Sequence, residues 1–492
     1  MNKAVIIGAG FGGLALGLRL QSAGIATTIV EARDQPGGHA WAWRQDGFTF
    51  DAGPTLIADP DSLAQLWRLS GHSMADDVTL LPVDPHYRFH WPDGTTFDHA
   101  VDETRLRAEI ARLSPADLAG YQRFVDYSAG VCRESYEALG PVACQELGTL
   151  VRAAPTLAQY QAWRSVYAMV ARFVKDERLR QALSFPPLLA GANPATASAL
   201  HTSLHALQRE GGLWFPQGGT HALVAAMVAQ FERLGGTLHL GDPVVAIEMV
   251  GDRATGVTTR AGLRVEGDAV ASNADIMHSY GALLAGHKRG PRRAQALTRK
   301  RWGPSAFVLH FGIEGTWPGI PHSMVLLGPR YQAWLTDIFD HGVLPADSCI
   351  ILHHPSLTDP SLAPPGHSTF QAIVPVPHLG KLPIDWGAVG PILTARILDE
   401  IEHRFIPEIR SRIKVQVTTA PPDFARNFNA YHGSAWGLEP LLSQSGWLRP
   451  HNRDDVIGNL YFVGAGTHPG AGIPGVVASA RATAALMLAD RG

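Results

Sequence analysis

The sequence predicts an α/β fold in which a nucleotide-binding domain is interleaved with a second region. Three observations support this class. A strand, a glycine-rich turn, a helix and a second strand open the chain between residues 4 and 31. Short β-branched segments return at 237–272, and a strand, a glycine loop and a helix close the chain at 460–489. Strands alternating with helices in this way are typical of an open parallel sheet.

The opening segment has the pattern of a βαβ unit that binds the ADP half of a dinucleotide. Strand Ala4–Gly8 runs into Gly8-Ala9-Gly10-Phe11-Gly12-Gly13, and Leu14–Ala23 has the apolar spacing of a helix. Gly8 makes the tight turn, Gly10 lets the backbone approach a pyrophosphate, and Gly13 lets the helix pack on the sheet. The phosphates would lie at the helix N-terminus, where free N–H groups favour anions.

The next segment indicates which dinucleotide is bound. The strand Thr27–Glu31 ends in a carboxylate that can accept the ribose hydroxyl hydrogens and would repel a 2′-phosphate. Pro36-Gly37-Gly38 follows, and a second glycine pair suits a backbone that passes close to a flavin. The cofactor prediction is FAD. We expect it to contact Gly8, Gly10, Phe11, Gly12, Gly13, Glu31, Ala32, Arg33, Gly37, Gly38, Gly53, Pro54, Thr55, Val245, Asn273, Gly464, Gly466, Thr467, Gly475 and Val476.

The rest of the chain predicts interleaved domains. Residues 102–207 read as mainly helical, 305–311, 349–353 and 369–374 as strands of a separate sheet, and Leu393–Phe405 as a long helix. We expect a discontinuous FAD-binding domain at 1–80, 212–290 and 450–492. Residues 81–211 would form a helical insert for membrane and substrate contact, and 291–449 a substrate-binding sheet with helices.

Composition narrows the class of protein. The net charge of −3 and the pI of about 6.7 argue against nucleic-acid binding. Cys132, Cys144 and Cys349 form no CxxC pair, which favours a reducing cytoplasm, and we expect no signal peptide before the first strand. Residues 456–480 carry no Asp, Glu, Lys or Arg, but their many Gly and Pro residues predict a buried strand and loop, not a membrane span.

Several blocks together resemble one enzyme family. They are Gly8–Gly38, Gly47–Thr55, Trp214–Thr220, Ser272–Asp275, Thr358–Pro364, Pro375–Leu379 and Gly464–Gly475. In this order they resemble the bacterial phytoene desaturases, FAD enzymes of carotenoid synthesis. The resemblance implies dehydrogenation of a C40 polyene towards lycopene and a fold like the glutathione reductase and amine oxidase flavoproteins. It also implies peripheral attachment to the cell membrane, with oxygen or a quinone accepting the electrons.

The chain departs from the wider superfamily at its final strand, where Gly464-Ala465-Gly466-Thr467 offers no carboxylate. Backbone N–H groups and the Thr467 hydroxyl would replace it, and we expect FAD to dissociate readily on purification. For catalysis, the resemblance points to an arginine with a nearby carboxylate. Arg152 fits, but Thr149 is no acid and Glu146 is the nearest preceding carboxylate. A solvated Arg152 is the alternative.

His468 is a second catalytic candidate, because its ordinary pKa of about 6.5 suits a base. A structural histidine bonded to backbone is the alternative. For membrane contact, apolar residues from Tyr160 to Val174 recur at helical spacing with Arg164, Arg172, Lys175 and Arg178 near them, and Trp163 and Tyr167 would face lipid. A helix packed on the core explains the same pattern.

Two other functions stay open at this point. One is another flavoenzyme of this fold, such as a polyene isomerase, a later carotenoid oxidase or an amine oxidase-type dehydrogenase. The other is a non-enzymatic carrier, against which the intact Gly8, Gly10, Gly13 and Glu31 argue. The number of desaturation steps also stays open, because it depends on how far the product can slide in the tunnel, and the electron acceptor leaves no readable motif.

Overall fold

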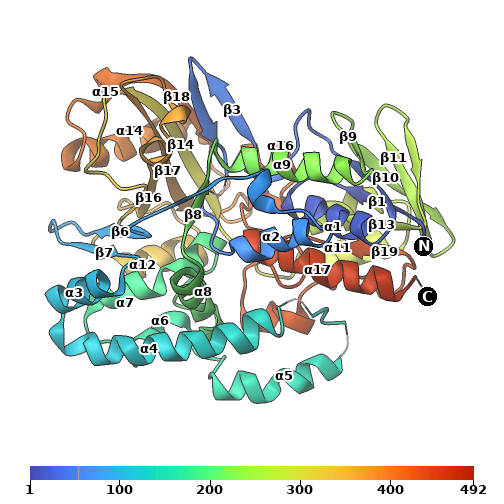
Figure 1. Ribbon diagram of the computed structural model, residues 1–492, viewed down its shortest axis with the longest axis horizontal. Helices are drawn as coiled ribbons and strands as arrows, with labels where there is room; N and C mark the ends of the chain where they lie inside the picture. Colours follow the sequence, from blue (N-terminus) through green and yellow to red (C-terminus); the bar gives the residue numbers. More distant parts are fainter. Residues whose placement is uncertain (54, 141, 146, 492) are drawn as a thin grey trace.

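The computed structural model describes residues 1–53, 55–140, 142–145 and 147–491 (Figure 1). The lobe that contains both chain ends is built on a five-stranded parallel sheet. Its strands, in spatial order, are β19 (Leu460–Phe462), β13 (Ala269–Ser272), β1 (Lys3–Ile7), β2 (Ala26–Val30) and β9 (Thr237–His239). Segments that are far apart in sequence thus pair side by side, as the α/β class requires.

The two faces of this sheet are covered by different elements, because successive side chains of a strand point to opposite faces. Ala4 and Ile6 pack in one apolar cluster with α1 (Phe11–Ser22), α9 (Thr220–Arg233) and α17 (Ile473–Ala489). Val5 and Ile7 pack in another, against a three-stranded antiparallel sheet. Its strands are β10 (Val244–Val250), β11 (Arg253–Thr259) and β12 (Arg264–Glu266).

The second lobe contains a seven-stranded mixed sheet, at the upper left of Figure 1. Its strands, in spatial order, are β18 (Ile413–Thr419), β14 (Ser305–Glu314), β17 (His367–Val376), β16 (Ile350–His353), β15 (Ser323–Leu326), β6 (Tyr87–His90) and β7 (Thr96–His99). Helix α14 (Trp386–Arg404) packs on one face through an apolar cluster. The expected separate sheet is therefore present, and residues 81–211, which we predicted as helical, contribute β6 and β7 to it.

The remaining elements connect and flank these sheets. Helices from residues 103–211 lie along the bottom of Figure 1. They are α3 (Glu103–Leu113), α4 (Leu118–Val131), α5 (Leu147–Gln159), α6 (Val166–Val170), α7 (Glu177–Ser184) and α8 (Ser203–Gly211). Two two-stranded antiparallel sheets are β3 (Ala42–Gln45) with β4 (Phe48–Asp51), a hairpin, and β5 (Leu80–Pro82) with β8 (Trp214–Pro216), which are distant in sequence. Short helices are α2 (Pro60–Arg68), α10 (Ile276–His278), α11 (Arg289–Leu297), α12 (Tyr331–Thr336), α13 (Pro355–Thr358), α15 (Ile409–Arg412) and α16 (Pro421–Phe428).

The apolar stretch near the C-terminus is divided between elements as predicted. Within residues 456–480 the chain forms β19, a loop and the first turns of α17, which begins at Ile473. No helix in the described part of the chain is both long and apolar enough to cross a bilayer.

Candidate active site

The turn between β1 and α1 leaves backbone donors free for an anion. Gly8 has φ +94° and donates its N–H to the Val30 carbonyl at 2.8 Å, which turns the chain off the first strand. Helix α1 then begins at Phe11 with no side-chain cap at Gly10 and no acidic residue in its first turn. Its first N–H groups therefore carry the partial positive charge that binds a pyrophosphate.

Glycines at this turn permit close approach of backbone segments. A Cβ on Gly13 would lie 2.1 Å from the Gly8 carbonyl oxygen, and one on Gly12 would lie 3.0 Å from Gly464 Cα. The Gly12 contact brings the first turn of α1 against the C-terminal glycine loop. The Gly13 contact is the close packing that the motif predicts, so its role lies in the fold of the cradle.

Glu31 is held rigidly at the end of β2. Its side chain is buried, and its two carboxylate oxygens accept the Ala9 N–H at 2.7 Å and the Arg33 N–H at 3.0 Å. A carboxylate has more lone pairs than these two bonds use, and Glu31 lines the cavity. The remaining acceptor capacity of Glu31 therefore fits the ribose hydroxyls of FAD.

A single cavity of about 1100 Å³ extends from this cradle to the seven-stranded sheet. Most of the predicted cofactor residues line it: Gly8, Gly10, Phe11, Gly12, Glu31, Ala32, Arg33, Gly37, Gly38, Gly53, Thr55, Val245, Asn273, Gly466, Gly475 and Val476. Gly13 and Gly464 lie behind the wall, and Pro54 is outside the described residues. The structure therefore brings together residues that are up to 468 positions apart in the sequence, from Gly8 to Val476.

Thr467 does not meet the role that we predicted for it. Its hydroxyl donates to the Pro450 carbonyl at 2.6 Å, and the residue is buried behind the cavity wall. The hydroxyl is thus already used within the protein. Backbone N–H groups are what the C-terminal loop can offer to a cofactor.

The far part of the cavity is apolar. One side is formed by the helical region and the residue before β8, which supply Leu189, Leu204 and Leu213. The other side is formed by the seven-stranded sheet, which supplies Ile351 and Ile373. Two polar pairs lie beside this apolar part: Gln208 Nε2 donates to the Tyr87 hydroxyl at 3.1 Å, and His353 Nδ1 lies 3.0 Å from Ser323 Oγ. Such a wall binds by shape and apolar burial.

Two buried aspartates anchor the loop Trp214–Thr220 beside the cavity. Asp51 accepts the Thr220 N–H at 2.7 Å, and Asp359 accepts the Gly218 N–H at 2.6 Å. Both side chains are buried. Three sequence blocks that we recognised separately are thereby joined, and Asp359 has a structural role that no local pattern indicated.

His468 lies in the cavity wall as expected. Its Nε2 is 3.6 Å from the Cys144 Sγ, and its Nδ1 is buried with no hydrogen-bond partner among the described residues. Burial, and secondarily the charge of Arg449, lowers the pKa of His468 to about 4. The imidazole is therefore neutral near pH 7, and its residue lines the cavity.

Arg152 is not in the cavity, contrary to our prediction. It is exposed on α5, and its Nη2 donates to Thr149 Oγ1 at 3.3 Å. Helix α5 instead turns Thr149, Ala153 and Leu157 to the cavity, four residues apart on one face. Glu146, its proposed partner, lies outside the described residues. The period of Thr149, Ala153 and Leu157 is the signal that could have identified this wall.

The expected helix from Tyr160 to Val174 is also wrong. Helix α5 ends at Gln159, Gln161 adopts a left-handed φ of +49°, and α6 covers only Val166–Val170. Tyr160, Val166, Val170 and Val174 are buried in the protein. Tyr167 is half-buried, and its hydroxyl donates to the Glu177 carboxylate. Of the two rings that we expected to face lipid, Trp163 is the exposed one, at 66%.

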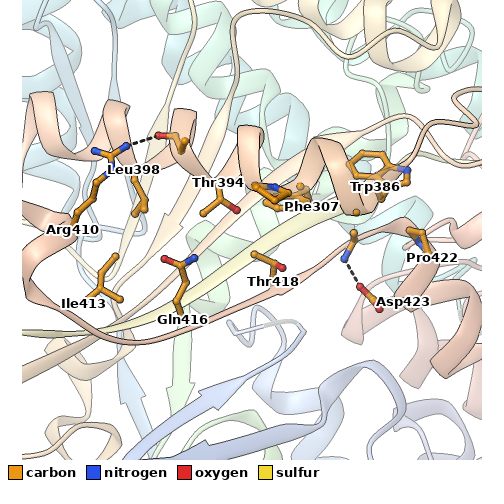
Figure 2. Close-up of a pocket in the computed structure, with 15 residues that line it drawn as sticks. Phe307, Trp386, Thr394, Leu398, Arg410, Ile413, Gln416, Thr418, Pro422 and Asp423 are labelled. Carbon is orange, nitrogen blue, oxygen red and sulfur yellow. Dashed lines mark hydrogen bonds between the residues drawn. The ribbon is translucent and has the colours of Figure 1, made fainter.

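A second hollow of about 740 Å³ lies on the opposite face of the seven-stranded sheet, below α14 (Figure 2). Phe307 stacks on Trp386 at one end, and Arg410 closes the other. Arg410 pairs with Asp399 and Glu402 and also donates to the Ala395 carbonyl at 3.0 Å. Its charge is satisfied by the protein, and none of the predicted site residues lies there.

Comparisons with known proteins agree with this geometry. Residues 11–488 match the family model of the flavin containing amine oxidoreductases. A lycopene-forming phytoene desaturase of Paracoccus sp. is 53% identical over 489 residues, covering 99% of this chain and 98% of that protein. One of Pseudescherichia vulneris is 51% identical over the full length of both chains. A neurosporene-forming phytoene desaturase of Cereibacter sphaeroides is 39% identical, covering 99% and 94%.

Solved structures share the fold at low identity. An oxidoreductase from Methanosarcina mazei superposes with a TM-score of 0.66 at 18% identity, covering 99% of this chain and all of that chain. A putrescine oxidase variant superposes with a TM-score of 0.65 at 16% identity, covering 99% of both. These two comparisons show the fold alone.

Proposed function

The chain belongs to the flavin containing amine oxidoreductases and, within them, to the phytoene desaturases, and from this we propose that it is an FAD-dependent enzyme that dehydrogenates phytoene to lycopene. One observation carries the proposal: a single cavity joins a dinucleotide cradle to an apolar wall. A hydrocarbon offers no hydrogen-bonding handle, so binding comes from burial at about 0.8 kcal/mol per CH₂. The amine oxidase-type and carrier alternatives receive no such support from the curated relatives.

The cradle residues determine how FAD is held. We propose that Glu31 binds the ribose hydroxyls and that the first N–H groups of α1 bind the pyrophosphate. We keep the three-part division of the chain: 1–80, 212–290 and 450–492 hold FAD, 81–211 covers the substrate, and 291–449 supplies the sheet against which it lies. When bound, FAD takes a hydride from the substrate.

We propose that His468 accepts the proton that must leave the substrate. Loss of a hydride beside a polyene leaves an allylic cation, which releases a proton readily, so a weak base is sufficient. Neutral His468, which lines the cavity, meets that need, and the apolar wall keeps water from trapping the cation.

His468→Gln should lower the desaturation rate by roughly 10²–10⁴-fold while leaving FAD binding intact. Arg152→Gln is the matched comparison, because Arg152 does not line the cavity. Rates should be compared per molecule of liposome-bound enzyme. If Arg152→Gln is the slower variant, the roles that we assign to these two residues are reversed.

We infer that α5 separates the cavity from a membrane surface. Thr149, Ala153 and Leu157 face the cavity, whereas Val151 is 66% exposed and Arg152 points outward. Exposed apolar residues with a basic neighbour suit a helix that lies in the lipid headgroup region. We therefore propose peripheral attachment at the cytoplasmic side of the cell membrane, where phytoene dissolves and where oxygen or a quinone removes the electrons.

The test is to mix the purified protein with FAD and phytoene-loaded liposomes and to chromatograph the pigments. A red, FAD-dependent product with the lycopene chromophore is expected, and Glu31→Arg without added FAD is the control. A shorter chromophore would contradict the assignment to lycopene. A colourless mixture, with FAD spectroscopically bound, would contradict desaturation itself.

A further inference from the structure

Arg449 is a buried arginine whose charge has no counterion. It is 2% exposed, and no described carboxylate pairs with it. Burial lowers the pKa of Arg449 to about 10, so the guanidinium is still charged near pH 7. Its Nη1 is buried with no hydrogen-bond partner among the described residues. An unpaired charge in a protein interior destabilises the fold, which suggests that Arg449 has a role other than stability.

The guanidinium lies directly behind the C-terminal glycine loop. Its Nε donates to the Thr467 carbonyl at 2.9 Å, and its Nη2 donates to the Ala465 carbonyl at 2.8 Å. A Cβ on Gly470 would lie 3.4 Å from Arg449 Cζ. Arg449 itself is outside the cavity wall, whereas Ala465, Gly466 and Gly470 line the cavity. The loop is thus a thin layer between the charge and the cavity.

The contact with Ala465 also orients a backbone donor. In a planar trans peptide the C=O and the following N–H point in opposite directions. The Ala465 carbonyl points to Arg449, so the Gly466 N–H points away from it, and this N–H donates to no described group. Helix α17 begins a few residues later with no side-chain cap at Gly472. Three sources of positive potential therefore converge at this end of the cavity.

Neighbouring charges reinforce the potential. Lys300 Nζ donates to the Leu448 carbonyl at 3.2 Å, and Arg293 Nε is buried with no hydrogen-bond partner in the described structure. Burial, then the charges of Arg293 and Arg449, lowers the pKa of Lys300, which shows that the three cations lie within electrostatic range of one another. None of the three forms an ion pair with a described carboxylate, and such a group of like charges favours a negative charge nearby.

The carotenoid substrate is an uncharged hydrocarbon, whereas FAD changes charge during turnover. A hydride brings two electrons and one proton, so the reduced ring carries one more negative charge than the oxidised ring until a further proton binds. We propose that Arg449 is a positioning residue that stabilises the reduced, negatively charged flavin through the Ala465–Gly470 loop. This rests on the proposed function and deepens it, because it makes the flavin a stronger oxidant.

The experiment is an equilibrium redox titration of the FAD-bound enzyme against a dye of known potential, with no carotenoid present. Arg449→Gln should weaken the binding of reduced relative to oxidised flavin about tenfold, which for two electrons lowers the potential by about 30 mV. Arg449→Lys, which keeps the charge, should shift it less. Thr467→Val is the matched control, because it removes the other tether of the same loop without changing charge.

The pH dependence of the potential provides a readout that a structural role would not change. Wild-type enzyme in mildly acidic buffer should take up one proton per two electrons, a slope of about 30 mV per pH unit, and Arg449→Gln should approach two protons, about 59 mV. Equal potentials for wild type and Arg449→Gln, or an equal shift in Thr467→Val, would overturn the proposal. If the Arg449→Gln variant retains no FAD, the wild-type enzyme alone decides: a potential that changes by about 59 mV per pH unit would overturn the proposal. The titration needs no desaturation, so its outcome is independent of the carotenoid assay.

Discussion

At the scale of single residues, the glycines of the nucleotide cradle differ in what an added side chain would meet. A Cβ on Gly10 would lie 3.0 Å from the Asn273 Nδ2, the end of a side chain that can move, and Gly10 lines the cavity. A Cβ on Gly13 would lie 2.1 Å from the Gly8 carbonyl oxygen, in backbone that cannot give way. One glycine thus makes room for the cofactor and the other for the fold.

Gly10→Ala should therefore fold with a nearly unchanged melting temperature but bind FAD at least tenfold more weakly. Gly13→Ala should lower the free energy of unfolding by about 1–3 kcal/mol, because it overpacks the β1–α1 contact. Thermal unfolding without FAD and flavin fluorescence titration measure the two effects separately. Full flavin retention by Gly10→Ala would show that the pyrophosphate lies elsewhere.

Variants at Glu31 and at a nearby carboxylate can distinguish a specific ribose contact from a general effect of charge. Glu31→Arg removes the acceptor for the ribose hydroxyls and the bonds to the Ala9 and Arg33 N–H groups, so the dissociation constant of FAD should rise by tenfold or more. Asp34→Arg makes the same charge change at an exposed position of the same turn. Equal losses in both variants would point to a general electrostatic effect instead of a ribose contact.

The residues that sequence reasoning identified share one property: their roles depend on local backbone. The turn at Gly8, the packing at Gly13 and the carboxylate at the end of β2 follow from a βαβ unit whose spacing is fixed. Arg449 carries no such signal, because its partners lie 16 and 18 positions away in a loop that only the folded chain places beside it. Thr467 was misassigned for the same reason.

At the scale of elements, α5 and the segment after it show where periodicity is insufficient. Small and apolar residues occur on every side of α5, so the four-residue period of Thr149, Ala153 and Leu157 is one of several faces that its sequence offers to the cavity. From Tyr160 to Val174 the apolar spacing suits a helix, yet left-handed Gln161 breaks it and a new cap at Ser165 starts α6. Tertiary packing decided both cases.

The outward face of α5 makes a prediction about the membrane. Val151→Asp combined with Trp163→Ser places a charge and removes a ring at two side chains that are each 66% exposed, so co-sedimentation with anionic liposomes should fall several-fold. Val250→Asp is the matched control, since Val250 is 70% exposed on β10 of the other lobe. FAD binding should be unchanged in all variants.

An equal fall in the Val250→Asp variant would indicate a general surface-charge effect. No fall in the double variant would contradict the assignment of α5 to the membrane surface, and the lipid contact would then have to be sought elsewhere on the helices of residues 103–211.

At the scale of the whole molecule, buried histidines join the substrate sheet to the helices. The rings of His86 and His99 lie 5.4 Å apart, and those of His99 and His205 5.2 Å apart, with Phe124 and Tyr121 of α4 against His205. Burial lowers the pKa of His86 to about 4 and that of His205 to about 3, and Arg209 adds to both shifts, while Asp84 partly opposes the shift of His86. Burial and the two histidine neighbours lower the pKa of His99 well below its ordinary range.

These shifts predict that the protein loses stability as the pH falls below about 6.5. The unfolded chain binds protons at its ordinary histidine pKa of about 6.5, whereas the folded protein resists them until about pH 4, so stability rises with pH in this window. Each such histidine contributes up to about 1.4 kcal/mol per pH unit to the slope of the unfolding free energy.

His205→Phe keeps an aromatic ring against Phe124 but removes one titrating group, so the slope of unfolding free energy with pH should become shallower by about that amount. Urea-unfolding midpoints across the window test this, with His403→Gln as the control, because it removes an exposed histidine that lies outside the buried cluster. A slope that His205→Phe leaves unchanged would mean that the cluster accepts protons without opening the contact between sheet and helices.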